Sequence, residues 1–389
     1  MRELTVVGGG LAGLVAAIEG AEAGAKVRLF EAKSRVGGRA ETTPPPYIAN
    51  LGPHALYRGT TSWAWLKARR LHRPSHMARS FAIRFRWRGE ARRLPPRELW
   101  PLVRLRGRSA PVDRDFRSWV ADEFGPEHAE PLSSAAGVFT FDHDPGRLSA
   151  AFVTEKVQRV ALKAIPVTRY PVGGFSAMAE RLASYALSLG VSIETSAQVD
   201  SLDSVRRGPV VVATQPSAAR RLLDDHALRV ESPRVALVDV GVRRKRSDPY
   251  LVSDLDEAAF VSRAGASTPS HAPAGHDLIQ AGVGLRPGEQ SEQGYARLDA
   301  IFDVAFADWR ERLTWRRELT VEESTGTLDL PGSTWRDRTP IRYSDGVWLA
   351  GDWVAAPGHF SEVAWNSAIA SVREALGTST GRPVDGRRQ

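Results

Sequence analysis

The segment from Leu4 to Phe30 constrains the fold of this chain more than any other. A short apolar run ends at Gly8, and Gly8, Gly10 and Gly13 follow the spacing G-x-G-x-x-G. When this motif lies between a strand and a helix, the first glycine allows a tight turn. The second lets the backbone approach a pyrophosphate, and the third lets the helix pack closely on its strand. We therefore predict a strand–turn–helix unit that binds a nucleotide.

The residues after the glycines complete this unit. The apolar spacing predicts a helix over Leu11–Ala23, ended by Gly24, and a strand over Lys26–Phe30. The start of that helix would present N–H groups and the positive end of its dipole to the pyrophosphate. Glu31 lies about 20 residues after the glycines, where an acid accepts hydrogen bonds from the ribose hydroxyls of an adenosine. The candidate contacts in this unit are Gly8, Gly10, Leu11, Ala12, Gly13, Glu31 and Ala32.

The composition limits the other chemistries that are open to the chain. A length of 389 residues favours two domains, and 42% hydrophobic with 25% charged residues is ordinary for a globular protein. The sequence has no cysteine, which excludes disulfides, thiolate metal sites, a cysteine nucleophile and a flavin tethered through sulfur. Its histidines lack metal-ligand spacing and no G-x-S-x-G elbow occurs, so we expect neither a metal nor hydrolysis.

The sequence contains no recognisable targeting segment. No charged n-region with an apolar core precedes the first strand, and no run of about 18 apolar residues follows. These features predict a cytoplasmic protein.

Residues 67–108 form a basic segment in a chain whose formal net charge is +8. Thirteen arginines in this range are opposed by two acids, Glu90 and Glu98, and are interleaved with Trp87 and Trp100. Three interpretations remain open: a solvated arginine-rich face, a surface that docks on an anionic membrane, and attraction for an acidic substrate or nucleic acid. Nothing in the spacing indicates base readout, so we expect no nucleic acid partner.

Further periodic segments predict the secondary structure beyond the glycine unit. Residues 81–94 alternate around Gly89 as a β-hairpin with one core or substrate-wall face and one solvated face. The first face carries Phe81, Ile83, Phe85 and Trp87, and the second carries Arg84, Arg86 and Arg88. We also expect helices over Leu148–Ile165 and Tyr295–Trp309, strands over Val235–Val242 and Leu278–Val283, and a disordered polar tail after Gly377.

Gly37, Gly38 and Arg39 shift the interpretation from a plain dinucleotide to a flavin. They end the polar loop that follows Glu31. An NAD domain has no need of a second glycine pair here, whereas the ribityl and phosphate groups of a flavin need close backbone and a positive partner. We expect Gly38 to allow that approach and Arg39 to bind the phosphate.

The glycine unit and the Gly-Gly-Arg segment resemble the flavin amine oxidase and phytoene desaturase superfamily of FAD-dependent oxidoreductases, which includes protoporphyrinogen oxidase. Asn50–His54 resembles the family's loop beside the isoalloxazine, although that loop more often begins with Asp. Val199 resembles the family's backbone contact to adenine. The other segments that agree with the family, in order, are Tyr170–Phe175, Gly208–Pro216, Gly346–Asp352 and the helix Glu362–Leu376.

This resemblance implies an α/β fold of the amine oxidase-like two-domain type, with a Rossmann-type FAD-binding domain and a discontinuous mixed α+β substrate domain. The FAD-binding domain would comprise residues 1–75, 167–233 and 335–377, and the substrate domain residues 76–166 and 234–334, followed by a tail over 378–389. FAD would bind non-covalently. The resemblance adds these cofactor contacts: Gly52, Pro53, Val199, Ala213, Gly351, Asp352 and Val363.

The resemblance also offers two candidates for catalytic or wall residues that face the flavin, His54 and Phe360. A loop histidine bonded to backbone is the alternative for His54. Amine oxidases of the superfamily often use a lysine near the flavin, and Lys245 is the lysine in a plausible region of this chain. The sequence Arg243–Arg246 around it is typical of a solvated turn, which weakens the case for amine oxidation.

By the same resemblance we expect an enzyme that passes a hydride from a lipophilic small molecule to flavin N5, with oxygen or a quinone-like compound as the electron acceptor. The first interpretation is the desaturation or dehydrogenation of an apolar or secondary-metabolite substrate, and amine oxidation is the second. A non-catalytic flavin-fold binding or escort protein stays open, as does a non-redox isomerase.

Overall fold

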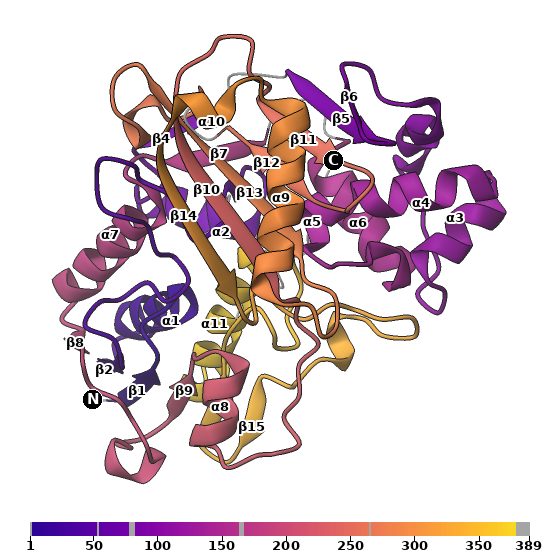
Figure 1. Ribbon diagram of the computed structural model, residues 1–389. Helices are drawn as coiled ribbons and strands as arrows, with labels where there is room; N and C mark the ends of the chain where they lie inside the picture. The colour runs from indigo at the N-terminus through magenta and orange to yellow at the C-terminus, as the bar shows by residue number, and fades with distance from the viewer. Residues whose placement is uncertain (1, 53, 78–81, 163–166, 264–265, 379–389) are drawn as a thin grey trace. The chain divides into compact units, whose positions relative to one another are not determined.

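A computed structural model describes residues 2–52, 54–77, 82–162, 167–263 and 266–378 of the chain. These residues fall into two compact units. Unit 1 contains the residues up to Ala40, Ala179–Val230 and the residues from Trp335 onward, and unit 2 contains Glu41–Met178 and Glu231–Thr334. Each unit is therefore assembled from segments that are far apart in the sequence (Figure 1).

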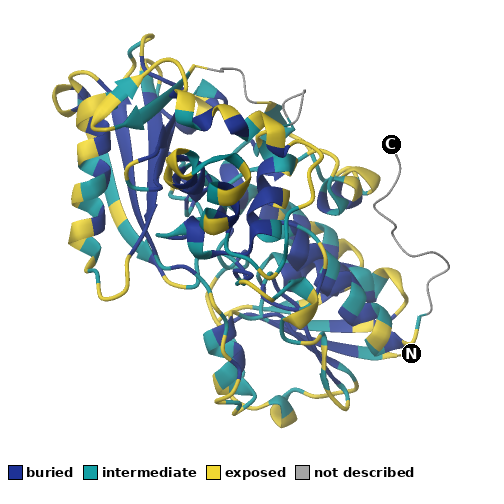
Figure 2. Cartoon of the chain, turned by 90° about the vertical axis from the view of Figure 1, so that its right-hand side faces the viewer, coloured by how far each residue is buried: buried dark blue, intermediate teal, exposed yellow. Residues whose placement is uncertain are grey.

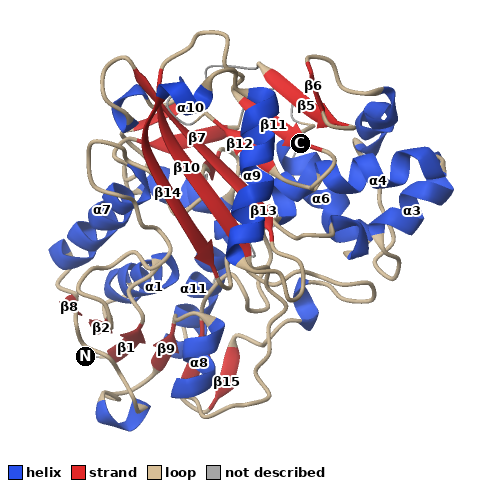
Figure 3. Cartoon of the chain, in the orientation of Figure 1, coloured by secondary structure: helices blue, strands red, loops and turns tan. Residues whose placement is uncertain are grey.

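Unit 1 is built on a six-stranded sheet with the order β15-β16-β9-β1-β2-β8 (Figure 3). All neighbouring strands are parallel except β15 and β16. The chain moves from β1 outward through β2 to β8, and then returns to the other side of β1 to form β9. The strands are β1 (Glu3–Val7), β2 (Lys26–Phe30), β8 (Ser192–Glu194), β9 (Val210–Val212), β15 (Arg342–Ser344) and β16 (Val347–Leu349).

Apolar helices pack on this sheet. The helix α1 follows β1 directly and packs against α11 as well as the strands, which is why its residues from Ala12 to Ile18 are all buried. The strand β2 has the predicted bounds, and α1 ends at Glu22, one position before the predicted end. The helices are α1 (Leu11–Glu22), α7 (Gly174–Ser188), which begins in unit 2, α8 (Pro216–Leu222) and α11 (Ser361–Leu376), with short 3₁₀ turns η3 (Leu202–Ser204) and η6 (Trp335–Asp337).

Unit 2 contains a seven-stranded sheet with the order β14-β10-β13-β12-β11-β5-β6. The strands pair antiparallel except for β5 and β11, which are parallel. The helix α9 (Ser291–Ala305) lies along β10 and β13 and covers an apolar core that includes Val240, Ile279 and Phe302 (Figure 1). The strands are β5 (Ile83–Trp87), β6 (Glu90–Arg92), β10 (Val235–Arg243), β11 (Leu251–Asp254), β12 (Phe260–Ser262), β13 (His276–Gly284) and β14 (Leu313–Val321).

A small sheet and a group of helices complete unit 2. The helices enclose a core of their own, in which Leu105, Phe116 and Val153 are fully buried, and Figure 2 shows this interior in dark blue. The small sheet has the order β3-β7-β4, with β3 (Leu56–Tyr57), β7 (Thr168–Pro171) and β4 (Ser75–Met77). The helical elements are α2 (Thr61–Ala68), η1 (Arg97–Leu105), α3 (Phe116–Phe124), α4 (Pro126–Ala135), α5 (Gly137–Thr140), η2 (Pro145–Arg147), α6 (Ala150–Val160), η5 (Pro269–His271) and α10 (Trp309–Arg312).

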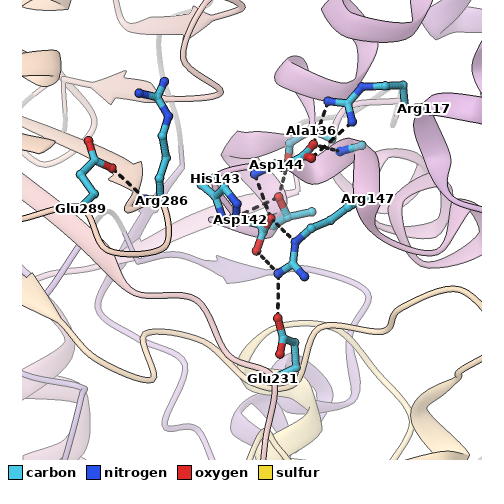
Figure 4. A network of polar contacts seen from close by, with 12 residues as sticks. Arg117, Ala136, Asp142, His143, Asp144, Arg147, Glu231, Arg286 and Glu289 are labelled. Carbon is cyan, nitrogen blue, oxygen red and sulfur yellow. Dashed lines mark hydrogen bonds and ion pairs between the residues drawn. The ribbon is translucent and has the colours of Figure 1, made fainter.

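A polar network joins the helical part of unit 2 to the segment before β10 (Figure 4). Arg147 donates to both oxygens of the buried Asp142, over 3.1 and 2.8 Å, and also to Glu231 over 2.8 Å. Arg117 holds Asp144 in the same turn. Because the buried carboxylate of Asp142 has a guanidinium partner, the network satisfies a charge that would otherwise be costly to bury. None of the helices that the structure describes is both long and apolar enough to cross a membrane.

The predicted hairpin is present as β5 and β6, with Gly89 at φ +75° in the turn. Its apolar side packs as expected, since Phe85 and Trp87 contact the helical core. The prediction that Arg86 lies on a solvated face is wrong. Its strand pairs with β11, where Arg86 stands opposite Asp254 and donates to that fully buried carboxylate over 2.8 Å.

Two predicted helices differ from the structure at their ends. The helix expected over Leu148–Ile165 is α6, which begins at Ala150 and ends at Val160. The helix α9 begins at Ser291 rather than Tyr295 because Gln290 and Gln293 form a reciprocal cap, which the apolar periodicity does not reveal. The predicted disordered tail falls, apart from Thr378, outside the described residues, as do Phe81 and Pro53.

Candidate functional site

The glycine turn between β1 and α1 has the geometry that the motif predicts. A Cβ on Gly8, whose φ is +105°, would lie 2.6 Å from the carbonyl oxygen of Ala213, and a Cβ on Gly13 would lie 1.8 Å from that of Gly8. These two glycines therefore allow close packing inside unit 1. A Cβ on Gly10 would meet no described atom within 4 Å. Gly10 is thus dispensable for packing, as expected of a position that a ligand approaches.

Gly37 and Gly38 lie against this turn. Gly37 forms a parallel bridge with Gly10, and its N–H donates to the carbonyl oxygen of Gly9 over 2.8 Å. A Cβ on Gly38 would lie 3.3 Å from the Cα of Gly10. Gly37 itself is buried, and a Cβ on it would lie 2.9 Å from the carbonyl oxygen of Ala40. Gly10 and Gly38 therefore form one stretch of partly exposed glycine backbone beside the start of α1. We refer to it as the glycine surface.

Glu31 follows β2 and is only 8% exposed. Its Oε2 accepts a hydrogen bond from the N–H of Gly9 over 2.6 Å, and its Oε1 accepts one from the N–H of Lys33 over 2.8 Å. A carboxylate oxygen can accept two hydrogen bonds, so these contacts leave capacity for ribose hydroxyls. Glu31 thus holds the glycine turn in place, and its contact with the ribose stays a prediction.

The segment after β8 runs beside Glu31. The N–H of Ala197 donates to the backbone carbonyl oxygen of Glu31 over 2.9 Å. Val199, two residues later, is partly buried against the apolar core of unit 1, whereas Ala32 is exposed. The structure therefore brings the predicted adenine contact close to the predicted ribose contact.

Arg39 and Asp352, which the sequence assigns to the phosphate and the ribityl chain of a flavin, form an ion pair. The Nη2 atom of Arg39 lies 2.6 and 2.7 Å from the two carboxylate oxygens of Asp352. The side chains are 26% and 13% exposed. The pair fixes the loop after β2 to the segment after β16.

The predicted cofactor residues of unit 1 gather at one edge of its sheet. Gly8 follows β1, Glu31 follows β2, Ala213 follows β9, and Gly351 and Asp352 follow β16. Open parallel sheets bind ligands outside the carboxyl ends of their strands, where the strand order reverses. In this sheet the reversal lies between β1 and β9, where Gly8 and Ala213 approach each other.

Two serines that the sequence analysis missed hold α11 to the end of β16. Ser367 Oγ accepts from the N–H of Gly351 over 2.9 Å, and Ser371 Oγ donates to the carbonyl oxygen of Leu349 over 2.6 Å. Both serines are completely buried, and so is nearly all of Val363, the predicted contact in this helix. The sequence does carry a signal for these contacts, because two small polar residues four positions apart lie on an otherwise apolar face of the helix.

Phe360 precedes α11 with φ +53° and ψ −133°, a conformation that costs a residue other than glycine on the order of 1–3 kcal/mol. Its ring centroid lies 6.5 Å from that of His359, which is 8% exposed. Strained residues cluster at functional sites, which agrees with the predicted role of Phe360 at the flavin. That role stays a prediction.

In unit 2 the Asn50–His54 loop lies against the start of α7. The side-chain oxygen of Asn50 accepts from the N–H of Phe175 over 2.9 Å, and the ring of His54 meets the ring of Phe175 edge-on at 5.4 Å. Gly52 allows the loop its turn at φ +93°. The structure therefore joins two segments that the family resemblance identified separately. The role of His54 stays a prediction.

A buried polar row, missed from the sequence, crosses the large sheet and reaches this loop. Asp239 of β10 stands opposite Gln280 of β13 and Arg317 of β14 and accepts from them over 3.0 and 2.9 Å. Both partners also donate to the carbonyl oxygen of Asn50, over 3.1 and 2.6 Å. Burial raises the pKa of Asp239, which is 0% exposed, although Arg317 opposes this change. The sequence signal for this row is a polar residue inside the apolar part of each of the strands β10 and β13.

Several neutral polar side chains lie in or beside the small sheet of unit 2. The hydroxyl oxygens of Tyr170 and Tyr250 are 2.8 Å apart. Burial raises the pKa of Tyr170 and raises that of Tyr57 to about 12. Burial also lowers the pKa of His271, which is 2% exposed, to about 4. At neutral pH these groups are uncharged and can donate or accept hydrogen bonds.

Lys245 lies in a solvated ion pair. Its Nζ atom is 2.8 Å from Asp308, and the two side chains are 36% and 60% exposed. The arginine-rich neighbourhood of Lys245 predicted this environment. Among the residues that the structure describes, no group of three or more His, Cys, Asp or Glu side chains could hold a metal ion.

Comparison with known proteins places this arrangement in a class of folds. A family model described as an NAD(P)-binding Rossmann-like domain matches residues 6–68, which include the glycine turn and Glu31. No curated protein matches the chain. Solved structures, among them an oxidoreductase and an amine oxidase, match it over nearly its whole length. The predicted fold class is therefore confirmed, and the resemblance to the flavin amine oxidase and phytoene desaturase superfamily holds at the level of the fold.

Three of these solved structures illustrate the likeness. An oxidoreductase from Methanosarcina mazei is 15% identical with a TM-score of 0.76, covering 96% of this chain and 100% of that one. A reduced UDP-galactopyranose mutase is 14% identical with a TM-score of 0.75, covering 98% and 96%. Cyclohexylamine oxidase from Brevibacterium oxydans is 16% identical with a TM-score of 0.74, covering 97% and 99%.

Proposed function

We propose that this chain is an FAD-dependent oxidoreductase that binds its cofactor non-covalently at the carboxyl edge of the unit 1 sheet. The observation that carries the proposal is the glycine surface. There the backbone of Gly10 and Gly38 lies partly exposed beside the start of α1, and a side chain at Gly10 would meet no described atom within 4 Å. A pyrophosphate needs this combination of close backbone and helix N–H groups.

The other residues of this edge fit the remaining parts of FAD. Glu31 keeps acceptor capacity for the ribose of the adenosine, and Arg39 and Asp352 offer opposite charges to the phosphate and the ribityl chain. When bound, FAD would supply a two-electron acceptor. The protein's part is to orient the substrate and to keep water away from it.

We propose the dehydrogenation of an apolar or secondary-metabolite substrate, with oxygen or a quinone-like compound as the final acceptor. The support lies in unit 2. Aromatic rings and uncharged hydroxyls lie near the Asn50–His54 loop and β7, including those of Phe175, Tyr170 and Tyr250. The charged Asp239 and Arg317 next to this loop pair with each other. Such groups suit a lipophilic substrate better than a charged one.

Amine oxidation is the second candidate. The likeness of fold to a cyclohexylamine oxidase favours it. Lys245 forms a solvated ion pair with Asp308, which weighs against its being the lysine that amine oxidases often use near the flavin. A non-catalytic binding protein and a non-redox isomerase are the outcomes that the next experiment separates from both.

The absorption spectrum of the purified protein tests the proposal. We expect a two-band flavin spectrum that bleaches on anaerobic reduction with dithionite, and FAD released by acid. Turnover would then be screened with polyenes and amines, with oxygen or a quinone as acceptor. A colourless protein that cannot be reconstituted with FAD would overturn the proposal. A flavin that no tested substrate reduces would favour the binding-protein or isomerase alternative.

The variant Gly10→Val tests the site itself. Gly10 has an extended backbone that any residue adopts, and an added side chain meets no described atom within 4 Å, so the protein should fold normally. FAD content should nevertheless fall by at least about tenfold, because the side chain would occupy the place of the pyrophosphate. The variant Ala227→Val, at an exposed position in unit 1, is the control. Unchanged FAD content in Gly10→Val would show that the site is elsewhere.

A further inference from the structure

The 3₁₀ helix η1 (Arg97–Leu105) sorts its residues into rows. A 3₁₀ helix has about three residues per turn, so side chains three positions apart lie above one another. One row is buried or partly buried in the helical core of unit 2 and consists of Leu99, Leu102 and Leu105. This row holds η1 against the helical core, and the core needs no other apolar residue of η1 except the buried Pro101.

A second row of the same helix is apolar and exposed. Trp100 and Val103 lie one turn apart, and each is 69% exposed. Leu94, just before the helix, is 78% exposed. These three belong to the few large hydrophobic residues of the described chain that are more than one-third exposed, and they lie within ten positions of one another. A cluster of this kind marks an interaction surface more often than a scattered exposed residue does.

The position of η1 is fixed at both ends, so this exposure is a property of the fold. The ring of His128 in α4 lies within hydrogen-bond distance of the carbonyl oxygen of Glu98, at 2.8 Å. The side-chain amide of Gln158 in α6 donates to the carbonyl oxygens of Leu105 and Arg108, over 2.6 and 2.7 Å. The protein therefore holds Trp100 and Val103 outward on a rigid support.

Exposed arginines flank the apolar row along the chain. Arg97 and Arg106 continue it at either end, and the side chain of Arg97 is 84% exposed. Of the two acids in the basic segment, Glu98 is mostly buried, with 12% of its side chain exposed, and the exposed Glu90 pairs with Arg92 over 3.2 Å. The exposed arginines from Arg92 to Arg106 are Arg92, Arg93, Arg97, Arg104 and Arg106, of which Arg93, Arg104 and Arg106 make no ion pair with a described residue.

We propose that this surface, formed by Leu94, Trp100 and Val103 with the five arginines that flank them along the chain, docks peripherally on an anionic lipid bilayer. The guanidinium groups match lipid phosphates, and the apolar row enters the boundary between headgroups and acyl chains, where tryptophan is favoured. Aliphatic Leu94 and Val103 gain nothing from a nucleic acid. The inference does not rest on the proposed function, because the surface lies wholly within unit 2.

Sedimentation with vesicles tests this surface. We would compare phosphatidylcholine vesicles with vesicles that contain one quarter phosphatidylglycerol, at low and at high salt. The full-length protein should sediment with the anionic vesicles at low salt, and binding should weaken as salt rises. The triple variant Arg93→Gln, Arg104→Gln, Arg106→Gln should bind about fivefold more weakly for each arginine replaced, the equivalent of about 1 kcal/mol each.

Variants of the apolar row separate lipid insertion from simple charge attraction. The double variant Trp100→Ser, Val103→Ser should bind anionic vesicles at least about tenfold more weakly while its thermal unfolding stays unchanged, since both side chains are exposed. Val304→Ser, at a 42% exposed apolar position on α9, is the matched control and should bind as the wild type does. No binding to anionic vesicles at low salt would overturn the proposal. So would equal binding by the double variant, which would indicate a polyanion site instead.

Discussion

Arg39 and Asp352 are 313 positions apart in the sequence, yet the Nη2 atom of the arginine lies 2.6 and 2.7 Å from the two carboxylate oxygens of the aspartate. One residue follows the second strand of unit 1 and the other follows β16, so the pair spans the carboxyl edge of the sheet. The protein thus keeps both groups in place before any cofactor binds. Such preorganisation lowers the entropic cost of binding.

The first prediction concerns this pair. Replacement Arg39→Ala should lower the free energy of unfolding of the cofactor-free protein by about 1–3 kcal/mol, because it removes a charge-assisted contact of a largely buried carboxylate. It should also weaken FAD binding at least about tenfold, because the phosphate contact that we propose for Arg39 would be lost. Urea unfolding and an FAD titration measure the two effects.

The control for Arg39 is Arg28, whose pair with Glu194 is longer, at 3.4 Å, and more exposed. The variant Arg28→Ala should change the free energy of unfolding by no more than about 1 kcal/mol and leave FAD affinity unchanged. A double-mutant cycle of Arg39→Ala with Asp352→Asn should show coupling. If the two effects simply add, the pair does not act as a unit.

The second prediction follows from the two backbone N–H groups that Glu31 holds. In Glu31→Gln the N–H groups of Gly9 and Lys33 lose their charged acceptor, and one of them faces the amide NH₂ of the glutamine. The free energy of unfolding of the cofactor-free protein should therefore fall by about 1.5–3 kcal/mol. A residue that only contacts ribose would show no such loss. Urea unfolding of Glu31→Gln is compared with that of Glu194→Gln, a partly exposed glutamate at the end of neighbouring β8, and this comparison decides between the two cases.

The parts of the fold that the sequence predicts are those set by local rules. The elements β1, α1 and β2 follow from apolar runs interrupted by glycines, whose roles are steric and do not depend on distant residues. The hairpin of β5 and β6 follows from alternation around Gly89. The fold class is therefore readable from the sequence together with the family resemblance.

The missed features depend on strand register and on the pairing of distant segments. Arg86 is withdrawn from solvent because its strand pairs with β11, which places Asp254 opposite it. Likewise the row through Asp239 exists because three strands align at one level. The ion pair of Arg39 requires β16 to lie two strands away from β1. No periodicity within one segment contains that information, although a polar residue inside an apolar strand shows that a partner must exist.

The third prediction concerns the polar row. Replacement Arg317→Met leaves Asp239 buried without its cation and should lower the free energy of unfolding by about 3–5 kcal/mol. Asp239→Asn should cost less, because burial already raises the pKa of that carboxyl and a neutral side chain avoids the desolvation penalty. Chemical unfolding of both single variants and of the double variant measures this, and the double variant should lose less than the sum.

Arg316 provides a matched control for Arg317. It is the preceding residue in β14, and its partners Asp299 and Glu318 are both partly exposed. The variant Arg316→Met should therefore cost no more than about 1 kcal/mol. Equal losses in Arg316→Met and Arg317→Met would mean that the buried row has no special weight in the stability of unit 2.

The fourth prediction is a pH dependence that originates at His271. Burial lowers its pKa to about 4, so the folded protein resists protonation while the unfolded chain takes up a proton below about pH 6.5. This group's contribution to stability is therefore complete above that pH and is lost as the pH falls towards 4, by about 3 kcal/mol in total. Relative to His271→Gln, the wild type should lose about this amount of unfolding free energy between pH 7 and pH 4 in urea unfolding.

The opposite contribution of Asp254, whose pKa burial raises to about 6, is common to both proteins and cancels in the difference. His226→Gln, at an exposed histidine, should unfold as the wild type does at every pH, and a constant difference between wild type and His271→Gln would refute the assignment.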